Sequence, residues 1–483
     1  MKRALEILKE NGPMLSGKLA NLLQLKYGIS NVVARKIVSR ATSPIHKLKN
    51  ISFEKNQKYI YLQEQFNSDI FFRNLLSAFR CSSRCYYQVV IAIRNNGGFI
   101  SKKVLASYVA APVENLTKHK RYDLIVADLI KLEFIQEYTD EYYQLLFPHV
   151  IGTDVKNTKG IELAKKTVVD DFCDWAKKLN IIAYNSAKTF FQCANFAKFQ
   201  WAFTSPSYIF NISDINTGKP GFWIGDIVLA QKADIEDIQF FLDKIDVIRN
   251  FKNLPHFIPV IIADNYTKEA YKLLKKKGVV CAQIGNLFSN RYANTLRELI
   301  PIIKNASAII SGNPENFVEY INKIASLEGK MGNLIGDLFE ANVGYYFHLI
   351  GCKYFELNKI IKYNGVKKEI DVYVVRDGKI KIVECKGIRS TLDHEYVKKW
   401  LSDNIPTIYK AIKNKNSNEI VEFELWSTGG YIDETKRLLD EAIKNTHKYS
   451  IKYYNASEIK MMAKESRCHV LEKSIDTILA ETV

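Results

Sequence analysis

The chain has 483 residues, which is too long for one ordinary hydrophobic core, so we expect about three or four domains. It is 47% hydrophobic and 25% charged, as in ordinary globular proteins, and no run of about 18 apolar residues predicts a membrane-spanning helix. The formal net charge of +17 suits a polyanionic partner, and a uniformly lysine-rich surface is the alternative interpretation.

The eight cysteines are scattered and form no Cys-x-x-Cys pair. This spacing favours neither a zinc site nor a disulfide framework, and it fits a reducing compartment. The first residues lead into an amphipathic pattern rather than the apolar core of a signal peptide. We therefore expect a cytoplasmic protein with no membrane partner.

The N-terminal segment 1–66 concentrates the positive charge. Residues 1–63 contain twelve Lys or Arg, three Glu and no Asp, a net charge of +9. The third expected helix should be capped by Ser30, with Val33 and Ile37 facing the core. The expected elements of the segment are helices over 2–10, 16–28 and 31–40 and strands over 50–53 and 58–62.

This order of elements resembles a winged helix-turn-helix domain, although no motif in the segment is residue-specific. In such domains the third helix enters the major groove of DNA and the wing touches phosphates. A winged helix that binds another protein is the alternative. The predicted DNA-binding residues of this domain are Asn31, Arg35, Lys36, Arg40, Lys47 and Lys49.

Residues 67–152 show a second helical pattern of similar design. The segment is much less basic than the first and rich in aromatic residues. We expect a winged-helix-like domain that serves packing or the positioning of DNA. The expected elements are helices over 86–95, 104–109 and 122–132, a break at Gly97-Gly98, and strands over 133–136 and 142–146.

The segments 155–308 and 315–465 then alternate between strands and helices, which is typical of α/β domains with a buried sheet. After a polar break at 154–160, the first has expected helices over 162–179, 235–249 and 267–277 and strands over 222–230, 257–263 and 279–284. The second has expected helices over 333–349, 395–412, 433–443 and 457–463, a hairpin over 369–386, and strands over 421–427 and 450–454, with a C-terminal tail at 466–483. Similar residues in 261–274 and 425–439 indicate an internal duplication, and convergent patterning is the alternative.

The hairpin 369–386 reads EIDVYVVRDGKIKIVECK and carries the strongest functional signal. A two-residue turn at Asp377-Gly378 would set Asp371 opposite Glu384. Glu384 and Lys386 share one face of the second strand, because side chains alternate along a strand. Buried charges are costly unless they are paired or bind a metal. Two acids and a lysine that converge therefore predict a site for a hard cation, with the lysine activating water.

The hairpin and its flanking elements resemble the PD-(D/E)xK nuclease superfamily and, within it, the Mrr-type restriction endonucleases. The resemblance covers residues 325–465. It implies a DNA endonuclease that depends on Mg²⁺, with Mn²⁺ as a substitute, and a role in restriction or anti-phage defence. The residues that carry it are Glu340, Ile370-Asp371-Val372, Val383-Glu384-Cys385-Lys386-Gly387 and Ser427-Thr428-Gly429-Gly430-Tyr431.

Phosphodiester chemistry and the resemblance imply the same roles for these residues. Asp371 and Glu384 would bind the metal together with the backbone carbonyl of Cys385. Lys386 would position the attacking water and stabilise charge in the transition state. Glu340 would approach the metal site from a helix face thinned by Gly336 and Gly344.

Other interpretations of these residues stay open. Asp371 and Lys386 could form a structural ion pair, with Glu384 at the end of the sheet. Glu369 could replace Asp371, although a solvated acid is the simpler interpretation. Lys398 and Lys399 are candidate DNA-binding residues that contact phosphates, or they are solvated surface lysines.

The segment 155–308 reads as a degenerate copy of the nuclease domain. Its strand over 222–230 leads to Ala230-Gln231-Lys232, where the acid of a Glu-x-Lys motif is missing. The counterpart strand over 207–212 has no central acid. Asp226 could be a displaced ligand, but one carboxylate is too few for Mg²⁺, so we expect an inactive domain.

The sequence therefore predicts a multidomain α/β protein with N-terminal winged helix-turn-helix units followed by two restriction-endonuclease-like α/β domains, the first degenerate. One active site per chain cuts one strand at a time, so the expected partners are duplex DNA and either a second copy in a homodimer or a partner defence subunit. The alternatives are a repair or junction-resolving nuclease, an RNase effector, and a non-catalytic DNA-binding regulator.

Overall fold

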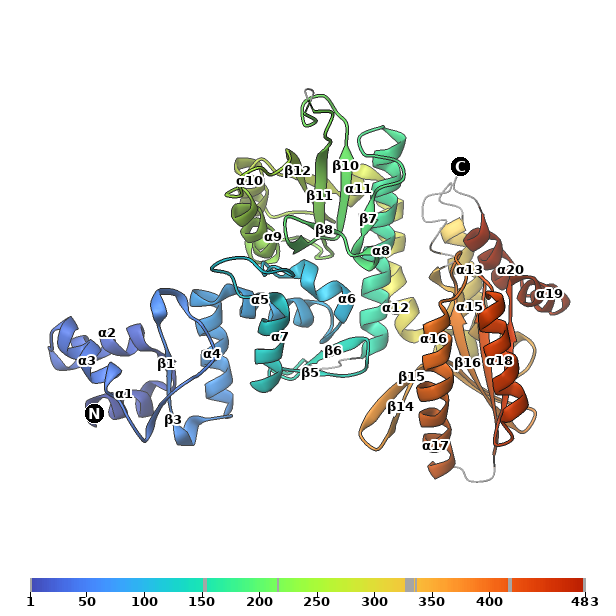
Figure 1. Cartoon of the computed structure of the whole chain (residues 1–483), viewed down its shortest axis with the longest axis horizontal. Helices are drawn as coiled ribbons and strands as arrows, with labels where there is room; N and C mark the ends of the chain where they lie inside the picture. The colour runs from blue at the N-terminus through green and yellow to red at the C-terminus, as the bar shows by residue number, and fades with distance from the viewer. Residues whose placement is uncertain are drawn as a thin grey trace. The chain divides into compact units, whose positions relative to one another are not determined.

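The computed structural model describes residues 2–150, 154–214, 217–325, 334, 337–415 and 419–480. It is a multidomain α/β protein with several sheets (Figure 1). The chain divides into two compact units: Met1–Thr158 with Ala176–Ala282, and Lys159–Trp175 with Gln283–Val483. The long helix α8 (Val155–Lys178) belongs to both. In the described part of the chain, every helix is too short or too polar to cross a membrane.

The N-terminal part of unit 1 contains three helices and a three-stranded sheet of order β1-β3-β2. The hydroxyl of Ser30 accepts a hydrogen bond from the N–H of Val33 and caps α3, as predicted. Gly28 ends α2 in the left-handed region, with φ of 63°. The elements are α1 (Lys2–Asn11), β1 (Met14–Leu15), α2 (Ser16–Tyr27), α3 (Asn31–Ser39), β2 (Ile45–Lys47) and β3 (Tyr59–Leu62).

Two expectations for this part are wrong. Val33 is 45% exposed, because the helical period that starts at the Ser30 cap turns Ala34 and Val38 into the core instead. Residues 50–53 form no strand, because Asn50 has φ of 68° and interrupts the extended backbone. The partner of β3 on this side is β2.

The next part of unit 1 repeats this arrangement. From α5 onward it has the same order of helix, strand, helix, helix, strand and strand as residues 2–62, and the last strand is again central in a sheet of order β4-β6-β5. Gly97 and Gly98 supply the predicted break, with φ of 87° and 88°. The elements are α4 (Asp69–Ser82), α5 (Arg84–Asn95), β4 (Phe99–Ser101), α6 (Lys102–Leu105), α7 (Tyr122–Lys131), β5 (Ile135–Glu137) and β6 (Tyr142–Leu145).

The rest of unit 1 is built on a five-stranded sheet of order β13-β12-β11-β10-β7. Strand β10 runs antiparallel to β7 and β11, whereas β11 and β12 run parallel. The predicted alternation of strands and helices is confirmed. The elements are β7 (Lys188–Thr189), β8 (Asn195–Phe196), β9 (Phe199–Gln200), β10 (Phe203–Ser207), β11 (Gly221–Val228), α9 (Ile235–Ile248), β12 (Phe257–Ala263), α10 (Lys268–Lys276) and β13 (Val280–Gln283).

Three boundaries in this region differ from expectation. The strand expected over 207–212 lies earlier in the chain, as β10 over Phe203–Ser207. The apolar residues 201–203 are buried, whereas Tyr208 and Phe210 are 67% and 72% exposed. Strand β11 ends at Val228, so Ala230-Gln231-Lys232 lies beyond the sheet. The break expected at 154–160 is helical from Val155 onward, because the carboxylate of Asp154 caps α8 by accepting from the N–H of Lys156.

Unit 2 contains the second five-stranded sheet, of order β14-β15-β16-β17-β18. Strands β14, β15 and β16 are antiparallel neighbours, and β16, β17 and β18 are parallel. The strands are β14 (Tyr354–Tyr363), β15 (Val366–Arg376), β16 (Lys379–Lys386), β17 (Ile420–Ser427) and β18 (Ser450–Tyr454). The helices are α11 (Ile284–Leu287), α12 (Asn290–Gly312), α13 (Pro314–Ala325), α15 (Phe339–Leu349), α16 (His394–Lys399), α17 (Ile405–Lys415), α18 (Asp433–Asn445), α19 (Ala456–Glu465) and α20 (His469–Leu479).

Helices cover both faces of this sheet (Figure 1). On one face Ile382 and Phe423 pack into a cluster with Trp400, Ile408 and residues of α18. On the other face the ring of Trp426 packs against the aromatic rings of α15. Because both faces of the sheet are covered, its accessible parts are the strand ends and the loops that follow them.

The helix expected over 395–412 is interrupted at Trp400–Asn404, which form one π-helical turn between α16 and α17. Pro406 explains the interruption, because it has no N–H for the carbonyl of Ser402 and its ring collides with that group. The first residues of the helix expected over 333–349 lie outside the described residues, and α15 is described from Phe339.

The C-terminal residues expected as a tail contain helix α20, which packs against α15. Val470, Leu471 and Ile475 are buried, at a spacing that one helix face can cover. The guanidinium Nε of Arg389, in the loop after β16, donates to the carbonyl of Ile478 at 2.6 Å. The C-terminal helix is therefore part of the domain that carries the hairpin.

Candidate active site

The hairpin of β15 and β16 has the geometry predicted for it. Asp377 and Gly378 have φ of 52° and 72°, as a two-residue turn of type I′ requires. The register pairs Arg376 with Lys379 and Val372 with Val383. One step further along the same register, Asp371 stands beside Glu384.

Three charged side chains meet at the carboxyl end of β16. The ammonium Nζ of Lys386 lies 2.7 Å from Oε1 of Glu384 and 3.5 Å from Oδ2 of Asp371. Asp371 and Glu384 are 7% and 9% exposed. The N–H of Cys385 donates to Oδ2 of Asp371 at 2.8 Å and fixes its orientation. The structure thus brings the three principal predicted residues together.

The electrostatics of the site favour a bound cation. Burial raises the pKa of the Glu384 carboxyl, and the charge of Asp371 adds to this shift, while Lys386 and Tyr396 oppose it. Burial alone would lower the pKa of Lys386, but Asp371 and Glu384 outweigh it and hold this pKa well above its ordinary value. Lys386 is therefore charged at neutral pH.

Tyr396 is a site residue that the sequence reasoning missed. Its hydroxyl donates to Oε1 of Glu384, and its ring centroid lies 5.1 Å from Nζ of Lys386. It comes from α16, one residue before the buried Val397 and four before the buried Trp400. A tyrosine beside the sheet-facing side of the next helix is the signal that could have revealed it.

Glu340 faces the same region from α15. Although 36% of its side chain is accessible, burial of its carboxyl raises its pKa; Lys159 opposes this shift, and Asp371 and Glu369 add to it. Nζ of Lys159, on α8, lies 3.8 Å from Oε2 of Glu340 and 2.7 Å from Oε1 of Glu369. Glu369 is therefore a paired and largely buried acid, and the expectation that it is solvated is wrong.

Lys159 also escaped the sequence reasoning. It lies in the segment expected to be a polar break, far from the hairpin in sequence. Because α8 begins at Val155, Lys159 is part of a helix, and its side chain is directed toward Glu340 and Glu369. In the structure it supplies the positive charge nearest to Glu340.

Close backbone contacts hold the elements around the site. A Cβ at Gly344 would lie 2.7 Å from Cδ2 of Leu357, so glycine lets α15 approach β14. A Cβ at Gly429 would lie 1.8 Å from the carbonyl oxygen of Ser390. The neighbouring hydroxyl of Thr428 accepts from the N–H of Ile388 at 2.9 Å. The Ser427–Tyr431 segment therefore fixes the loop that follows Lys386. Gly336 lies outside the described residues.

The predicted DNA-binding residues fall into two groups. Those of the N-terminal segment belong to unit 1, and all are exposed except Lys47, whose Nζ donates to the carbonyl of Ser39 at 2.6 Å. Lys398 and Lys399 belong to unit 2, where they are exposed on the helix that carries Tyr396. The N-terminal group comprises Asn31, Arg35, Lys36, Arg40, Lys47 and Lys49.

The donor atoms of the site suit a hard cation. Within the described residues, no three His, Cys, Asp or Glu side chains are grouped to hold a metal. Mg²⁺ needs less than that, because it keeps several waters and binds proteins through one or two carboxylates plus substrate phosphates. Asp371 and Glu384 provide two such carboxylates, whereas a structural zinc site would need four nitrogen or sulfur ligands.

Comparison with known proteins found no matching protein-family model and no matching curated protein. A crystal structure of a protein described as being of unknown function is 18% identical, with a TM-score of 0.20, and the match covers 27% of this chain and 67% of that one. The structure of EndoMS with double-stranded DNA is 10% identical, with a TM-score of 0.17, covering 31% of this chain and 58% of the other. TM-scores this low carry no argument about this chain.

Proposed function

We propose that this protein is a Mg²⁺-dependent DNA endonuclease of the PD-(D/E)xK type that acts in restriction or anti-phage defence. One observation carries the proposal: the ammonium of Lys386 bridges two nearly buried carboxylates, Asp371 and Glu384, at the end of a strand. Burying two neighbouring carboxylates costs free energy, and a bound cation would offset that cost. Mn²⁺ would substitute for Mg²⁺, because both accept oxygen ligands.

Each residue of the site has a defined task in phosphodiester hydrolysis. Asp371 and Glu384 would hold the cation, with the backbone carbonyl of Cys385 as a further oxygen ligand. When bound, Mg²⁺ polarises the scissile phosphate and lowers the pKa of water. Lys386 donates hydrogen bonds to the attacking water and to the charge that develops on the phosphate. Tyr396 keeps Glu384 oriented.

Duplex DNA is the proposed substrate because of where the positive charge lies. Residues 1–63 carry a net charge of +9, and Arg35 and Lys36 of α3 are exposed together with Arg40, which caps its C-terminal end. Lysine and arginine on an exposed helix bind the phosphate backbone and displace its counterions. We assign residues 1–66 and 67–152 to winged-helix domains, 155–308 to a degenerate nuclease-like domain and 315–465 to the nuclease domain.

The described part of the chain holds one such site, so cutting both strands requires a second copy or a partner subunit. In the proposed assembly, each site hydrolyses one strand of the duplex. A homodimer is the simplest arrangement, because most oligomers are symmetric.

The direct test is cleavage of supercoiled plasmid by the purified full-length protein with Mg²⁺. Asp371→Asn should lower the cleavage rate by roughly 100-fold or more, because it removes one of the two charged ligands. Lys379→Met is the control, since it removes a charged side chain at the far end of the neighbouring strand β16, where 42% of the side chain is exposed. Equal cutting by wild type and Asp371→Asn would refute the assignment of the site.

A further inference from the structure

The five-stranded sheets of the two units share one topology. In each, the order along the sheet follows the chain, the first three strands are antiparallel and the next pair is parallel. Strands β7, β10, β11, β12 and β13 therefore correspond to β14, β15, β16, β17 and β18. A helix follows the third strand in both sheets, α9 in unit 1 and α16 in unit 2.

Two tyrosines fix the register of this correspondence. The hydroxyl of Tyr266 donates to the carbonyls of Ile261 and Ala282, at 2.7 and 3.3 Å. The hydroxyl of Tyr431 donates to the carbonyls of Leu425 and Tyr454, at 2.9 and 3.2 Å. Each tyrosine thus joins the fourth strand of its sheet to the fifth, so Ile261 corresponds to Leu425.

The register then identifies the counterparts of the active-site residues. Leu425 pairs with Glu384, and Ile261 pairs with Asp226, so Asp226 stands at the position of Glu384. Two residues later, Val228 stands at the position of Lys386. The antiparallel register of β10 and β11 places Ala202 where the other sheet has Asp371.

Asp226 is enclosed by protein and paired with a lysine of α9. It is 1% exposed, it accepts the N–H of Ala202 at 2.8 Å, and it forms an ion pair with Lys244, whose side chain is 0% exposed. Nζ of Lys244 also donates to the carbonyls of Ser107 and Gln200, at 2.8 and 3.0 Å. The ammonium therefore contacts three oxygens, those of the Asp226 carboxylate and of the Ser107 and Gln200 carbonyls.

We propose that the former catalytic position of this sheet is now an internal lock, in which the Asp226–Lys244 pair fastens residues 103–113 to the end of β11. The ammonium of Lys244 takes the place that a metal ion would need, and the lock uses the carbonyl of Ser107 as its third oxygen. In this proposal, the position that corresponds to the nuclease site of the other sheet binds the second N-terminal domain instead of a metal ion.

Further contacts between residues 103–113 and the residues around Asp226 support this role. The hydroxyl of Tyr108 donates to the carbonyl of Ile227, next to Asp226, at 3.0 Å. The amide of Gln200 donates to the carbonyl of Lys103 at 2.6 Å. The N–H of Val113 donates to the carbonyl of Lys198 at 2.9 Å. Residues 103–113 are thus tied to residues 198–227 of the same unit on both sides of Ser107.

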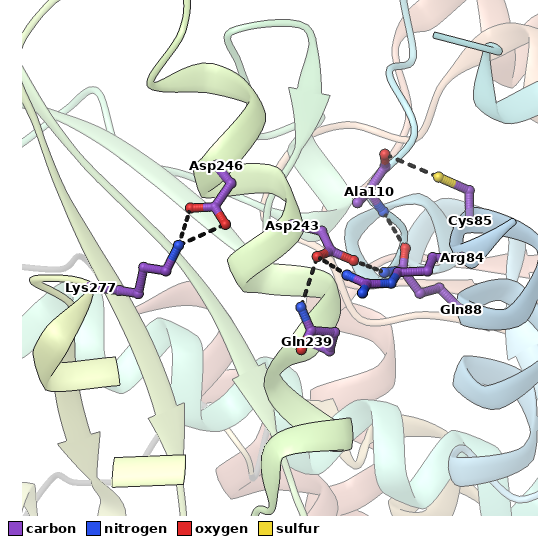
Figure 2. A network of polar contacts seen from close by, with 8 residues as sticks. All are labelled: Arg84, Cys85, Gln88, Ala110, Gln239, Asp243, Asp246 and Lys277. Carbon is purple, nitrogen blue, oxygen red and sulfur yellow. Dashed lines mark hydrogen bonds and ion pairs between the residues drawn. The ribbon is translucent and has the colours of Figure 1, made fainter. Parts of the chain in front are cut away.

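Helix α9 makes a second connection to the same domain, which Figure 2 shows. Asp243 accepts from Arg84 and Gln88 of α5, at 3.1 and 2.8 Å. The amide oxygen of Gln88 in turn accepts the N–H of Ala110 at 2.8 Å. Figure 2 also shows Asp246 of α9 in an ion pair with Lys277 at 2.8 Å, and these two side chains are 48% and 35% exposed. This second pair provides a matched control.

The test is a set of variants of the full-length protein, with melting temperature and hydrogen exchange as readouts. Lys244→Met and Asp226→Asn should each lower the melting temperature of this unit by on the order of 10 °C, because each leaves a buried group without its partner. Exchange of the Ala110 and Val113 amides should quicken by roughly tenfold or more. The double variant Asp226→Asn/Lys244→Met should melt closer to wild type than either single variant.

Lys277→Met and Asp246→Asn are the controls and should change neither readout appreciably, since exposed pairs contribute little. The lock is refuted if Lys244→Met and Asp226→Asn behave like these controls. It is also refuted if Asp226→Asn melts like wild type and loses Mg²⁺-dependent cleavage, which would make Asp226 a working ligand. The readouts of stability and exchange stand even if the proposed nuclease activity fails.

Discussion

Lys386 pairs with two carboxylates and yet stays partly accessible to solvent. Its ammonium stands 2.7 Å from Glu384 and 3.5 Å from Asp371, and 24% of the side chain is still accessible. Lys244, on helix α9 of the other unit, is fully buried against Asp226 of the corresponding sheet. The first arrangement leaves part of the lysine accessible to solvent, and the second does not.

The metal-binding role of the two acids predicts opposite effects for two substitutions. Asp371→Asn should weaken Mg²⁺ binding by roughly tenfold or more, because it removes one charged ligand. Lys386→Met should keep or tighten Mg²⁺ binding, because it removes a positive charge, yet it should abolish cleavage. Calorimetric titration with Mg²⁺ separates the two. Weaker binding in Lys386→Met would show that the lysine supports the ligands rather than the chemistry.

Tyr396 is predicted to act by positioning Glu384. Tyr396→Phe removes the hydroxyl that donates to Oε1 and leaves the ring beside Lys386. Cleavage at saturating Mg²⁺ should fall by roughly tenfold, and half-maximal activity should require more Mg²⁺. Tyr409→Phe on α17 is the control, since it removes a tyrosine hydroxyl from the same helical segment. A response equal to that of the control would leave Tyr396 as a packing residue.

At this scale the sequence predicted the charged residues and missed their supports. Asp371, Glu384 and Lys386 stand out because acids and a lysine interrupt an apolar strand pattern. Tyr396 and Lys159 make ordinary contributions to helix patterns, and only the packing of α16 and α8 brings them to the site. The sequence around Tyr396 and Lys159 has no pattern that would show that these residues contact the site.

At the scale of elements, the contact between α15 and β14 positions Glu340. Gly344→Val should lower the free energy of unfolding by about 1–3 kcal/mol, because the new side chain collides with Leu357. Gly312→Ala is the control, since a Cβ there meets nothing within 4 Å. Denaturant unfolding gives both values. If Gly344→Val were as stable as Gly312→Ala, the close approach of α15 would not be a constraint.

Helices and strands with a regular pattern of apolar residues were predictable from the sequence. Features that depend on the backbone conformation of a single residue were not. The hairpin 369–386 combines alternation with an Asp-Gly turn, so its register follows from the sequence. The π-helical turn at Trp400–Asn404 depends on a single proline, and the strand expected over 50–53 fails at one left-handed residue. Helix α20 was overlooked because its apolar residues follow a polar stretch at the end of the chain.

For the whole molecule, the concentration of charge at the N-terminus predicts where DNA binds. The triple variant Arg35→Ala/Lys36→Ala/Arg40→Ala should weaken binding to all duplexes and flatten the salt dependence, by about one unit of slope for each phosphate that the variant no longer neutralises. Replacing Lys268, Lys272 and Lys276 of α10, all exposed, lowers the net charge equally and is the control. Fluorescence anisotropy over a salt series measures both. Equal weakening in the two triple variants would indicate attraction by net charge alone.

The internal duplication was predicted from the sequence, and the two sheets share the topology that it requires. The details could not be predicted, because the sequence alignment placed the lost motif at Ala230-Gln231-Lys232. The strand register places it at Asp226 and Val228 instead. The sequence similarity between these two segments is too weak to fix a register, whereas hydrogen bonds such as those of Tyr266 and Tyr431 fix it directly.

The most direct test of the nuclease account follows supercoiled plasmid over time with Mg²⁺, comparing wild type with Glu384→Gln. The account predicts that wild type converts the plasmid to nicked or linear DNA, and that Glu384→Gln produces neither at a measurable rate. Cleavage by Glu384→Gln at the wild-type rate, or by wild type in the presence of a chelator, would contradict the account.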